Sequence, residues 1–252
     1  MGWHPSKERG HSHSASSTRV EHRMLDLLQD HPDKDRSEPR PKAVAVPELT
    51  LPPETPVEVR DRCTSDFLAG LVTDPGIGAF SRYSPQAADR QLAALVKVSA
   101  LQGSRVLVAL RGRSVVAYLT FHPAEPDSRW ASFPHGQILE LGGIEVARCM
   151  RGRGLARTLM DLAFSPPDFD AVIVYAQALT WCWDLQGSAL SLEDYRQMML
   201  RLFGAYGFEP YLTDEPNIRY DRANLLLARL GREVPPLLVS QFLASLVEGS
   251  GT

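Results

Sequence analysis

The spacing of apolar residues along the chain predicts a series of strands. Apolar and β-branched residues dominate 106–110 and 115–121, and the connector between them, which contains Gly112, is short enough for an antiparallel hairpin. A longer run over 138–147 predicts a third strand, and an apolar run over 171–176 predicts a fourth. The middle of the chain is therefore expected to contribute a sheet.

Other segments have the spacing of helices. Apolar residues over 154–164 recur on one stripe, which predicts a helix. Ser191 has an acidic residue three positions later and is expected to cap a second helix, which Gly207 ends. Further on, the pattern predicts a short strand and two more helices, over 208–212, 223–230 and 237–247. Strands that alternate with helices indicate a mixed α/β sheet covered by helices.

The first 42 residues lack the apolar side chains that a folded core requires. They hold eight Lys and Arg, seven Asp and Glu, and five of the seven histidines. This composition predicts a disordered extension over 1–42, with one short helix near 20–30, and a single folded domain over 43–252. His11 and His13 suggest a metal site, but their Ser-rich surroundings favour a solvated linker, and no metal is expected.

Composition and charge exclude several classes of function. The chain is 44% hydrophobic and 23% charged, as in an ordinary soluble globular protein. Its 27 basic and 30 acidic residues leave a net charge of −3, so nucleic acid is not expected as a partner. We expect no membrane span and no secretion signal, because no apolar run is long enough. Three widely spaced cysteines favour the cytoplasm.

The segment that carries most chemical information is the turn after the strand 138–147. A strand that leads through a Gly- and Arg-rich turn directly into a helix gathers unpaired backbone N–H groups at the helix N-terminus. Such a point binds phosphate. Gly152 and Gly154 let a ligand approach the backbone, and positive charge comes from Arg151, Arg153 and Arg157.

This turn resembles the cosubstrate-binding loop of the GNAT acetyltransferases. Residues 151–156, Arg-Gly-Arg-Gly-Leu-Ala, fit the family signature [Arg/Gln]-x-x-Gly-x-[Gly/Ala] and lie between a strand and a helix, as that family requires. The resemblance implies the GNAT (acyl-CoA N-acyltransferase) fold, a mixed and mostly antiparallel sheet with a splayed central strand pair, flanked by helices. It also implies that acetyl-CoA is bound by Ile144, Val146, Arg151, Gly152, Arg153, Gly154, Leu155, Ala156 and Arg157.

Further segments resemble one branch of this family, the acetoin-utilisation (AcuA-type) acetyltransferases. They are residues 140–147, 181–187, 195–199, 214–218 and 223–231, and nothing before residue 43 takes part. Members of this branch are understood to acetylate a lysine of acetyl-CoA synthetase and so to switch it off. The resemblance implies the same reaction and the same protein partner for this chain, with a role in acetate and acetoin metabolism.

Two positions depart from the family pattern. Arg148 stands where a proline is common, three residues before the signature. Phe203 stands where many members have a tyrosine that protonates the departing thiolate. Tyr206, Tyr175 or water could replace that general acid, and the sequence does not choose among them.

The reaction also needs a base, because a free lysine amine has a pKa near 10.4 and is charged at pH 7. Glu140 lies eleven residues before Arg151, where protein-acetylating members of the family place a glutamate base, and Glu145 is the alternative. In a regular strand these two carboxylates face opposite sides. A β-bulge at residues 142–143, Gly-Gly, would bring both to one face, where one pKa would rise. We favour Glu140 as the base.

The same bulge is expected to splay this strand from 171–176 and to free the backbone groups of Ile144 and Val146. Trp181 and Trp183 either form the floor of a lysine channel or fill the core, and the roles of Asn224 and Arg229 stay open. Two other functions remain possible at this point. One is acetyl transfer to a small amine, and the other is a non-catalytic acyl-CoA sensor.

Overall fold

A computed structural model describes residues 55–78 and 86–247, which fall within one compact unit, Pro47–Thr252. The predicted extension over 1–42, its short helix and the pair His11 and His13 lie outside the described residues. These predictions, and the domain boundary at residue 43, stay predictions.

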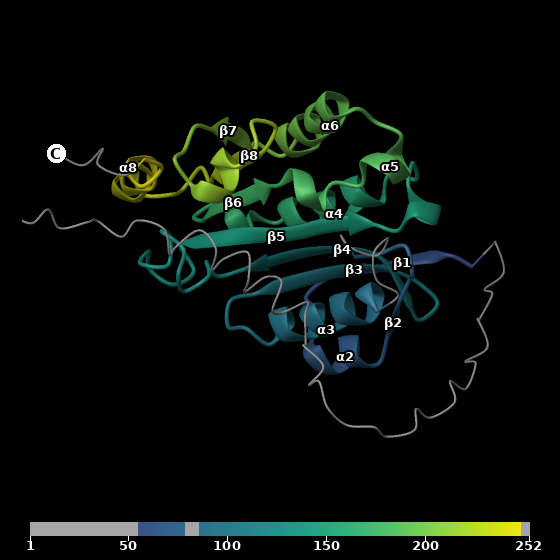
Figure 1. Ribbon diagram of the computed structural model, residues 1–252. Helices are drawn as coiled ribbons and strands as arrows, with labels where there is room; N and C mark the ends of the chain where they lie inside the picture. The colour runs from purple at the N-terminus through teal and green to yellow at the C-terminus, as the bar shows by residue number, and fades with distance from the viewer. Residues whose placement is uncertain (1–54, 79–85, 248–252) are drawn as a thin grey trace, which may run out of the picture. The chain divides into compact units, whose positions relative to one another are not determined.

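The centre of the described fold is one mixed sheet of eight strands (Figure 1). The strands run in the order β1-β3-β4-β5-β6-β8-β7, and β2 pairs with β4 at the side. Only the pairs β2–β4 and β5–β6 are parallel. The bounds are β1 Val57–Arg60, β2 Val72–Thr73, β3 Arg105–Arg111, β4 Ser114–His122, β5 Ile138–Val146, β6 Ile173–Ala178, β7 Glu209–Tyr211 and β8 Leu225–Leu230.

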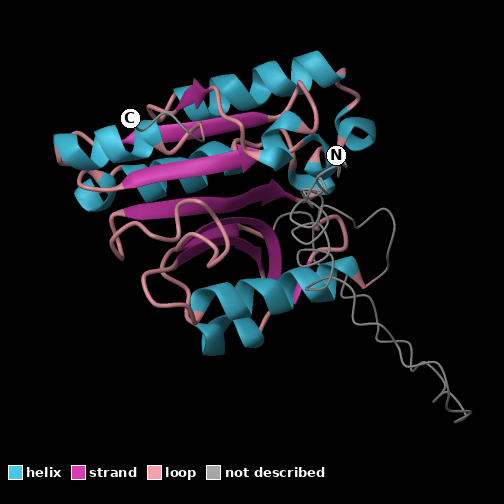
Figure 2. Cartoon of the chain, turned by 60° about the vertical axis from the view of Figure 1, so that its left-hand side comes forward, coloured by secondary structure: helices cyan, strands magenta, loops and turns pink. Residues whose placement is uncertain are grey.

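Helices flank this sheet, and Figure 2 shows them in cyan around the strands. In Figure 1, α2 and α3 lie below β3 and β4, whereas α4 and α6 lie above β5. The helices are α2 Ser65–Ala69, α3 Ala87–Ser99, α4 Leu155–Phe164, α5 Leu185–Ser188, α6 Leu192–Gly204, α7 Pro216–Arg219 and α8 Pro236–Ala244. Short 3-10 turns are η1 Arg148–Met150, η2 Pro167–Phe169 and η3 Thr180–Cys182. None of the described helices is long and apolar enough to cross a membrane.

Most of the predicted elements are confirmed. The hairpin is β3 and β4, the third and fourth predicted strands are β5 and β6, and the helix after the Gly-rich turn is α4. The Ser191 side chain caps α6 by accepting a hydrogen bond from the Asp194 N–H at 3.1 Å. Gly207, with φ 80°, turns the chain out of that helix toward β7.

The predicted helix over 223–230 is wrong, because Leu225–Leu230 form β8, an inner strand between β6 and β7. Leu225, Leu226, Leu227 and Ala228 are all buried. A strand covered on both faces reads as a continuous apolar run, and leucine and alanine also favour helices, so spacing alone did not distinguish the two.

One residue in the middle of β5 sets the geometry of the site. Gly143 pairs with Thr120 on β4, and Leu141 pairs with Phe121, so Gly142 is the extra residue of a β-bulge. Before the bulge Glu140 pairs with His122, and after it Glu145 pairs with Tyr118. Since residues 118 and 122 of one strand share a face, Glu140 and Glu145 share it too, as predicted.

Strand β5 also parts from β6 close to this bulge. The two strands pair only over Ile138–Glu140 with Ile173–Tyr175. Beyond that point Gly142 is exposed, and the four residues after it are only half-buried. The splayed central pair predicted for the sheet is therefore present, and we call the unpaired region after Glu140 and Tyr175 the strand opening.

Candidate active site

The Gly-rich loop forms the N-terminus of α4. Gly152 and Gly154 have φ of 75° and 78°, a left-handed conformation that glycine adopts without strain, and Gly154 is the N-cap of α4. The first intrahelical bond runs from the Thr158 N–H to the Gly154 oxygen at 3.0 Å. The N–H groups of residues 155–157 precede it and have no helical acceptor, so they can bind a phosphate. A Cβ at either glycine would meet nothing within 4 Å, so the space beside the loop is open.

The arginines of this segment divide into two groups. Arg151 is held within the protein, because its Nε donates to the Val146 oxygen at 3.2 Å and its Nη1 to Asp184 Oδ2 at 2.8 Å. Arg153 and Arg157 are exposed and form no ion pair with the described residues. Of the three predicted phosphate-binding arginines, only these two therefore extend into solvent, and Arg151 holds the loop in place.

Asp184, the N-cap of α5, received no role in the sequence analysis. It accepts two hydrogen bonds from Arg148, at 2.7 and 2.8 Å, and one from the Gly187 N–H at 2.9 Å, in addition to that from Arg151. Burial alone would raise its pKa, but these hydrogen bonds hold the pKa of Asp184 well below its ordinary value. Arg148, at the family's proline position, thus joins the loop to α5.

The strand opening presents unpaired backbone groups to this loop. The Ala147 N–H donates to the Val116 oxygen at 2.8 Å, and antiparallel bonding alternates along a strand, so Glu145 also bonds to β4. The backbone groups of Ile144 and Val146 therefore point toward the opening. The Arg151 guanidinium occupies the Val146 oxygen here.

Two buried polar atoms without a partner among the described residues lie in this part of the chain. They are Oε1 of Gln177, on β6 beyond its pairing with β5, and Nε1 of Trp183, just after η3. A buried polar group without a hydrogen bond is costly, so such atoms suit a ligand that supplies one. Together with the open loop at α4, they fit a polar arm and a diphosphate such as those of acetyl-CoA.

Glu145 is held at both carboxylate oxygens. Its Oε1 accepts a hydrogen bond from the Gly78 N–H at 2.9 Å, and its Oε2 accepts one from the Tyr118 hydroxyl at 3.0 Å. Burial raises the pKa of Glu145, while these hydrogen bonds and the charge of Arg151 oppose the rise. Burial and the charge of Glu145 also raise the pKa of Tyr118 well above its ordinary value.

Glu140 lies at the start of the strand opening and has one oxygen less constrained. The Tyr175 hydroxyl donates to its Oε2 at 2.9 Å, and no described residue donates a hydrogen bond to its Oε1. Burial raises the pKa of Glu140, whereas the charge of His122 and the hydrogen bond from Tyr175 lower it. A half-buried carboxylate with a raised pKa suits proton transfer near neutral pH.

The sequence analysis expected the two carboxylates, Glu140 and Glu145, to lie close enough for one to raise the pKa of the other. The structure keeps them apart. Their partners on β4, His122 and Tyr118, lie four residues apart, which is about 13 Å along a strand. Burial, rather than mutual repulsion, is the main cause of both raised pKa values. The site therefore contains two separate carboxylates on one face of the sheet.

The candidates for a general acid lie in different places. Phe203 is buried and packs edge-on against Phe208. The Tyr206 hydroxyl donates to Asp161 at 2.7 Å, and burial with that bond raises its pKa to about 12. Tyr175 bonds to Glu140 instead. Tyr118, which the sequence analysis did not consider, is the tyrosine beside Glu145 and the strand opening.

The remaining residues that the sequence singled out have structural partners. Trp183 is buried and stacks on Tyr195 at 5.0 Å, whereas Trp181 contacts the exposed Tyr220 edge-on. Asn224 Oδ1 accepts a hydrogen bond from the Thr180 N–H at 2.7 Å. Arg229 donates to the Phe169 oxygen at 2.8 Å. Trp183 thus belongs to the core, and the last two residues support backbone turns.

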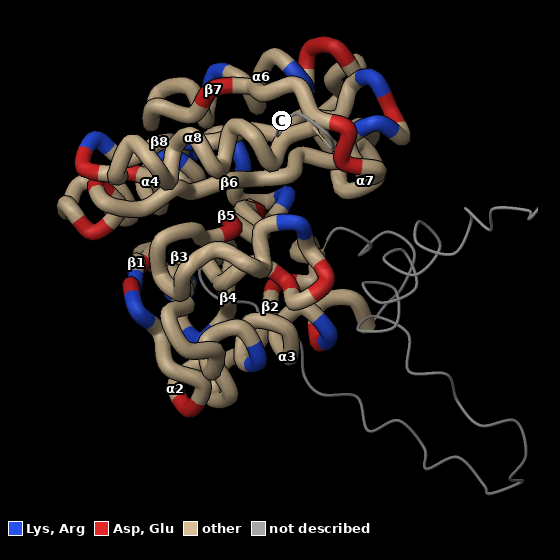
Figure 3. Tube along the Cα trace, turned by 90° about the vertical axis from the view of Figure 1, so that its left-hand side faces the viewer, with Lys and Arg blue, Asp and Glu red and all other residues tan. Residues whose placement is uncertain are grey.

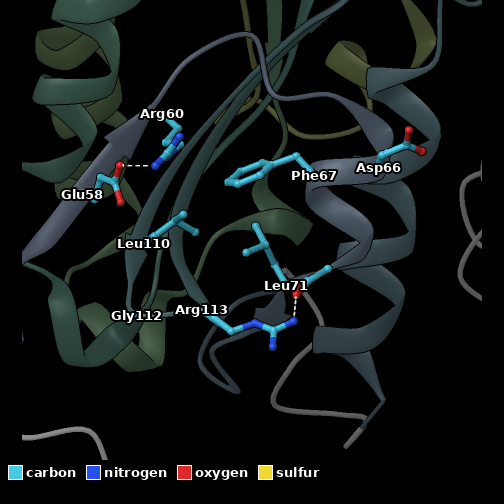
Figure 4. A pocket seen from close by; sticks show the side chains of 9 residues that line it. Glu58, Arg60, Asp66, Phe67, Leu71, Leu110, Gly112 and Arg113 are labelled. Carbon is cyan, nitrogen blue, oxygen red and sulfur yellow. Dashed lines mark hydrogen bonds and ion pairs between the residues drawn. The ribbon is translucent and has the colours of Figure 1, made fainter.

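A pocket of about 420 Å³ among the described residues lies elsewhere. Figure 4 shows it between β1, α2 and the β3–β4 hairpin, with Phe67, Leu71 and Leu110 turned toward its centre. Arg113 closes one end through a hydrogen bond to the Gly70 oxygen. None of the predicted cosubstrate-binding residues lines this pocket. In Figure 3 basic and acidic residues are interspersed along the described chain.

Comparison with known proteins identifies relatives of this chain. Residues 73–165 match the acetyltransferase (GNAT) family. The acetoin utilization protein AcuA of Bacillus licheniformis is 31% identical over 153 residues, which cover 61% of this chain and 73% of that protein. AcuA of Bacillus subtilis strain 168 is 34% identical over 149 residues, which cover 59% of this chain and 71% of that protein.

A solved structure is similar as well. The crystal structure of an acetoin utilization protein from Exiguobacterium sibiricum aligns with a TM-score of 0.71 and 35% identity, over 76% of this chain and 89% of that one. The match to the GNAT family includes the loop at α4 and the strand β5, since both lie within residues 73–165. The chain therefore belongs to the GNAT family of acetyl-CoA-dependent acetyltransferases, with the acetoin utilization proteins as its relatives.

Proposed function

We propose that this chain transfers the acetyl group of acetyl-CoA to a protein lysine, with Glu140 as the base and acetyl-CoA synthetase as the target. The observation that carries the assignment is the position of Glu140. It lies where β5 and β6 part, it is half-buried, and one of its oxygens has no donor among the described residues. The AcuA relatives support acetoin utilisation as the context, and we propose acetate metabolism and the cytoplasm as the setting.

Acetyl-CoA would be bound by the loop and by the strand opening. The N–H groups of residues 155–157 and the side chains of Arg153 and Arg157 would hold the diphosphate, and Arg151 would keep the loop in place. The backbone groups of Ile144 and Val146 would hold the pantetheine arm, once Arg151 releases the Val146 oxygen. The thioester would then lie near the end of the opening, close to Glu140.

Glu140 would remove one proton from the lysine ammonium. The neutral amine attacks the thioester carbonyl carbon, the C–S bond breaks, and the sulfur of CoA takes up a proton. Glu145 suits a supporting role, because hydrogen bonds from Gly78 and Tyr118 already engage both of its oxygens. The Tyr118 ring lies beside Gly143 on β5 and its hydroxyl donates to Glu145, so Tyr118 is our candidate for the group that protonates the sulfur.

The proposal predicts that Glu140→Gln and Glu145→Gln differ. Glu140→Gln preserves the shape of the side chain but removes the base, so transfer to acetyl-CoA synthetase at neutral pH should fall by roughly 10²-fold. The acetyl-CoA affinity, measured by calorimetry, should stay close to that of the wild type. Because a base works in its ionised form, wild-type kcat/KM should fall as the pH falls through the raised pKa of Glu140, and part of the lost rate in Glu140→Gln should return at high pH.

Glu145→Gln serves as the matched control and should lose less activity. Mass spectrometry of the acceptor locates the acetylated lysines. If Glu145→Gln is the inactive variant instead, the two carboxylates exchange roles. If both variants match a slow wild type, the chain is an acyl-CoA sensor. If only small amines such as polyamines are acetylated, the protein target is wrong.

A further inference from the structure

We propose that Glu145 is a positioning residue, which holds the turn 74–78 against β5 and so shapes the surface that a protein acceptor contacts. This inference rests on the proposed function, in which the acceptor is a protein and Glu140 takes the lysine proton. Three observations support it: a hydrogen bond between β5 and the turn, the packing of the turn on the end of β5, and the face of the sheet on which the turn lies.

The hydrogen bond joins two residues that are 67 positions apart in the sequence. Glu145 Oε1 accepts it from the Gly78 N–H at 2.9 Å, and Gly78 is buried. A buried N–H needs an acceptor, and a carboxylate is a stronger acceptor than a neutral oxygen. The Tyr118 hydroxyl donates to Oε2 at 3.0 Å, so the carboxylate is held at both oxygens. Glu145 thus fixes the end of the turn to β5.

The rest of the turn is fixed by contacts of its own. The Asp74 N–H donates to the Val115 oxygen on β4 at 3.0 Å, and Asp74 Oδ1 accepts a hydrogen bond from the Gly76 N–H at 2.8 Å. Ile77 is fully buried. A Cβ built at Gly76 would lie 3.2 Å from the Arg148 backbone nitrogen. The middle of the turn therefore lies against the segment that leads from β5 into the loop before α4.

The turn lies on the face of the sheet that carries the base. Glu140 and Glu145 share that face, and Gly78 meets the Glu145 side chain. The acceptor lysine has to approach Glu140 from the same face. The two carboxylates are about 13 Å apart along the strand, so the reacting amine does not reach the turn. A protein acceptor covers roughly 800 Å² of its partner, and the residues around its lysine extend that far.

The first test measures the anchoring without any reaction. Hydrogen exchange followed by NMR reports the Gly78 amide. In Glu145→Ala this amide loses its acceptor and should exchange roughly 10-fold faster or more, while the amides of β3 exchange as in the wild type. Tyr118→Phe is the matched control, because it removes the other hydrogen bond to Glu145 and leaves Oε1 in place. It should leave the exchange of Gly78 unchanged.

The second test separates binding of the acceptor from chemistry. For transfer from acetyl-CoA to acetyl-CoA synthetase, Glu145→Ala should raise the KM for the protein acceptor by roughly 10-fold and change kcat much less. The acetyl-CoA affinity, measured by calorimetry, should stay close to that of the wild type. Tyr118→Phe should show the opposite pattern, a lower kcat at an unchanged KM for the acceptor.

A third variant loosens the turn while Glu145 stays in place. Asp74→Ala removes the hydrogen bond to the Gly76 N–H, so the KM for the acceptor should rise as it does in Glu145→Ala. Asp66→Ala, which removes an exposed carboxylate on α2, should leave this KM unchanged. A raised KM in Glu145→Ala with a wild-type KM in Asp74→Ala would mean that Glu145 contacts the acceptor itself, and would overturn the positioning role.

The remaining outcomes distinguish this inference from the proposed function. Unchanged exchange of Gly78 in Glu145→Ala overturns the anchoring, whatever the activity. A lower kcat at an unchanged KM in Glu145→Ala also overturns the inference, because it assigns Glu145 to the chemical step. A wild type that transfers nothing to acetyl-CoA synthetase overturns the proposed function and the role in acceptor binding, while the exchange of Gly78 still decides whether Glu145 holds the turn.

Discussion

A single carboxylate, Asp184, joins three parts of the site. It bonds to Arg148 before the loop, to Arg151 within it and to the Gly187 N–H in α5. Its side chain is only 16% exposed, so these ion pairs are less screened than ordinary surface pairs. Asp184 therefore stabilises the fold and fixes the position of the loop before α4.

Asp184→Asn should destabilise the protein in a pH-dependent way. The pKa of Asp184 is lowered in the folded state, so its contribution is complete above the ordinary value of 3.8 and is lost as the pH falls through the folded-state value. We expect a loss of about 1–3 kcal/mol at pH 7, and a smaller difference from the wild type as the medium becomes acidic. Urea unfolding at several pH values measures this.

Glu209→Gln on β7 is a suitable control for that experiment. Glu209 is exposed and has no ion pair with the described residues, so its removal should change stability by less than about 0.5 kcal/mol. A difference between Asp184→Asn and the wild type that does not vary with pH would mean that the ion pairs contribute nothing.

Residues of the motif could be predicted from the sequence, but their partners could not. Glu140 and Glu145 follow from their distance to Arg151 along the chain. Tyr118 and His122 depend on which residue of β4 faces which residue of β5, and one extra residue at the bulge changes that register. The ion pair between Arg148 and Asp184 joins residues 36 positions apart and leaves no local signal.

At the level of elements, the loop before α4 owes its shape to two left-handed glycines. Gly154→Ala would place a Cβ on a residue with φ 78°, which costs about 1 kcal/mol and strains the backbone that presents the N–H groups. The Cβ itself meets nothing, so the effect comes from backbone conformation alone. Calorimetry should show acetyl-CoA binding weakened by about 10-fold, or about 1.4 kcal/mol.

Gly204→Ala provides the comparison. Gly204 ends α6, a Cβ there also meets nothing within 4 Å, and its φ is not positive. This variant should bind acetyl-CoA as the wild type does. Equal affinities for Gly154→Ala, Gly204→Ala and the wild type would remove the loop from the cosubstrate site.

Elements were predictable where periodicity and end signals agreed. The β5 bulge was predicted because two adjacent glycines interrupt an otherwise apolar strand, and α6 because Ser191 marks its start. β8 was missed because its continuous burial removes the alternation that identifies a strand. Within the predicted domain the sequence analysis assigned no element between residues 43 and 105, where α2 has five residues and β2 only two, too few for a period to emerge.

For the molecule as a whole, the order of strands and helices follows the predicted architecture. The strands of the pairs β3–β4 and β4–β5 follow each other in sequence, so turn residues and the spacing of apolar residues can predict these pairs. The pairing of β6 with β8 encloses more than forty intervening residues and depends on a core that no local pattern describes. Long-range topology came from the resemblance to a known family rather than from periodicity.

Along β5, amides that face the strand opening alternate with amides that bond to β4, and hydrogen exchange can distinguish the two sets. The amides of Ile144 and Val146 point into the opening, whereas those of Glu145 and Ala147 bond to β4. Without ligand, the first pair should exchange with solvent deuterium much faster than the second. Saturating acetyl-CoA should slow the even-numbered amides and leave the odd-numbered ones nearly unchanged, whereas equal slowing of all four would indicate general rigidification. In the proposed binding mode the cosubstrate takes the place of a missing strand in the sheet.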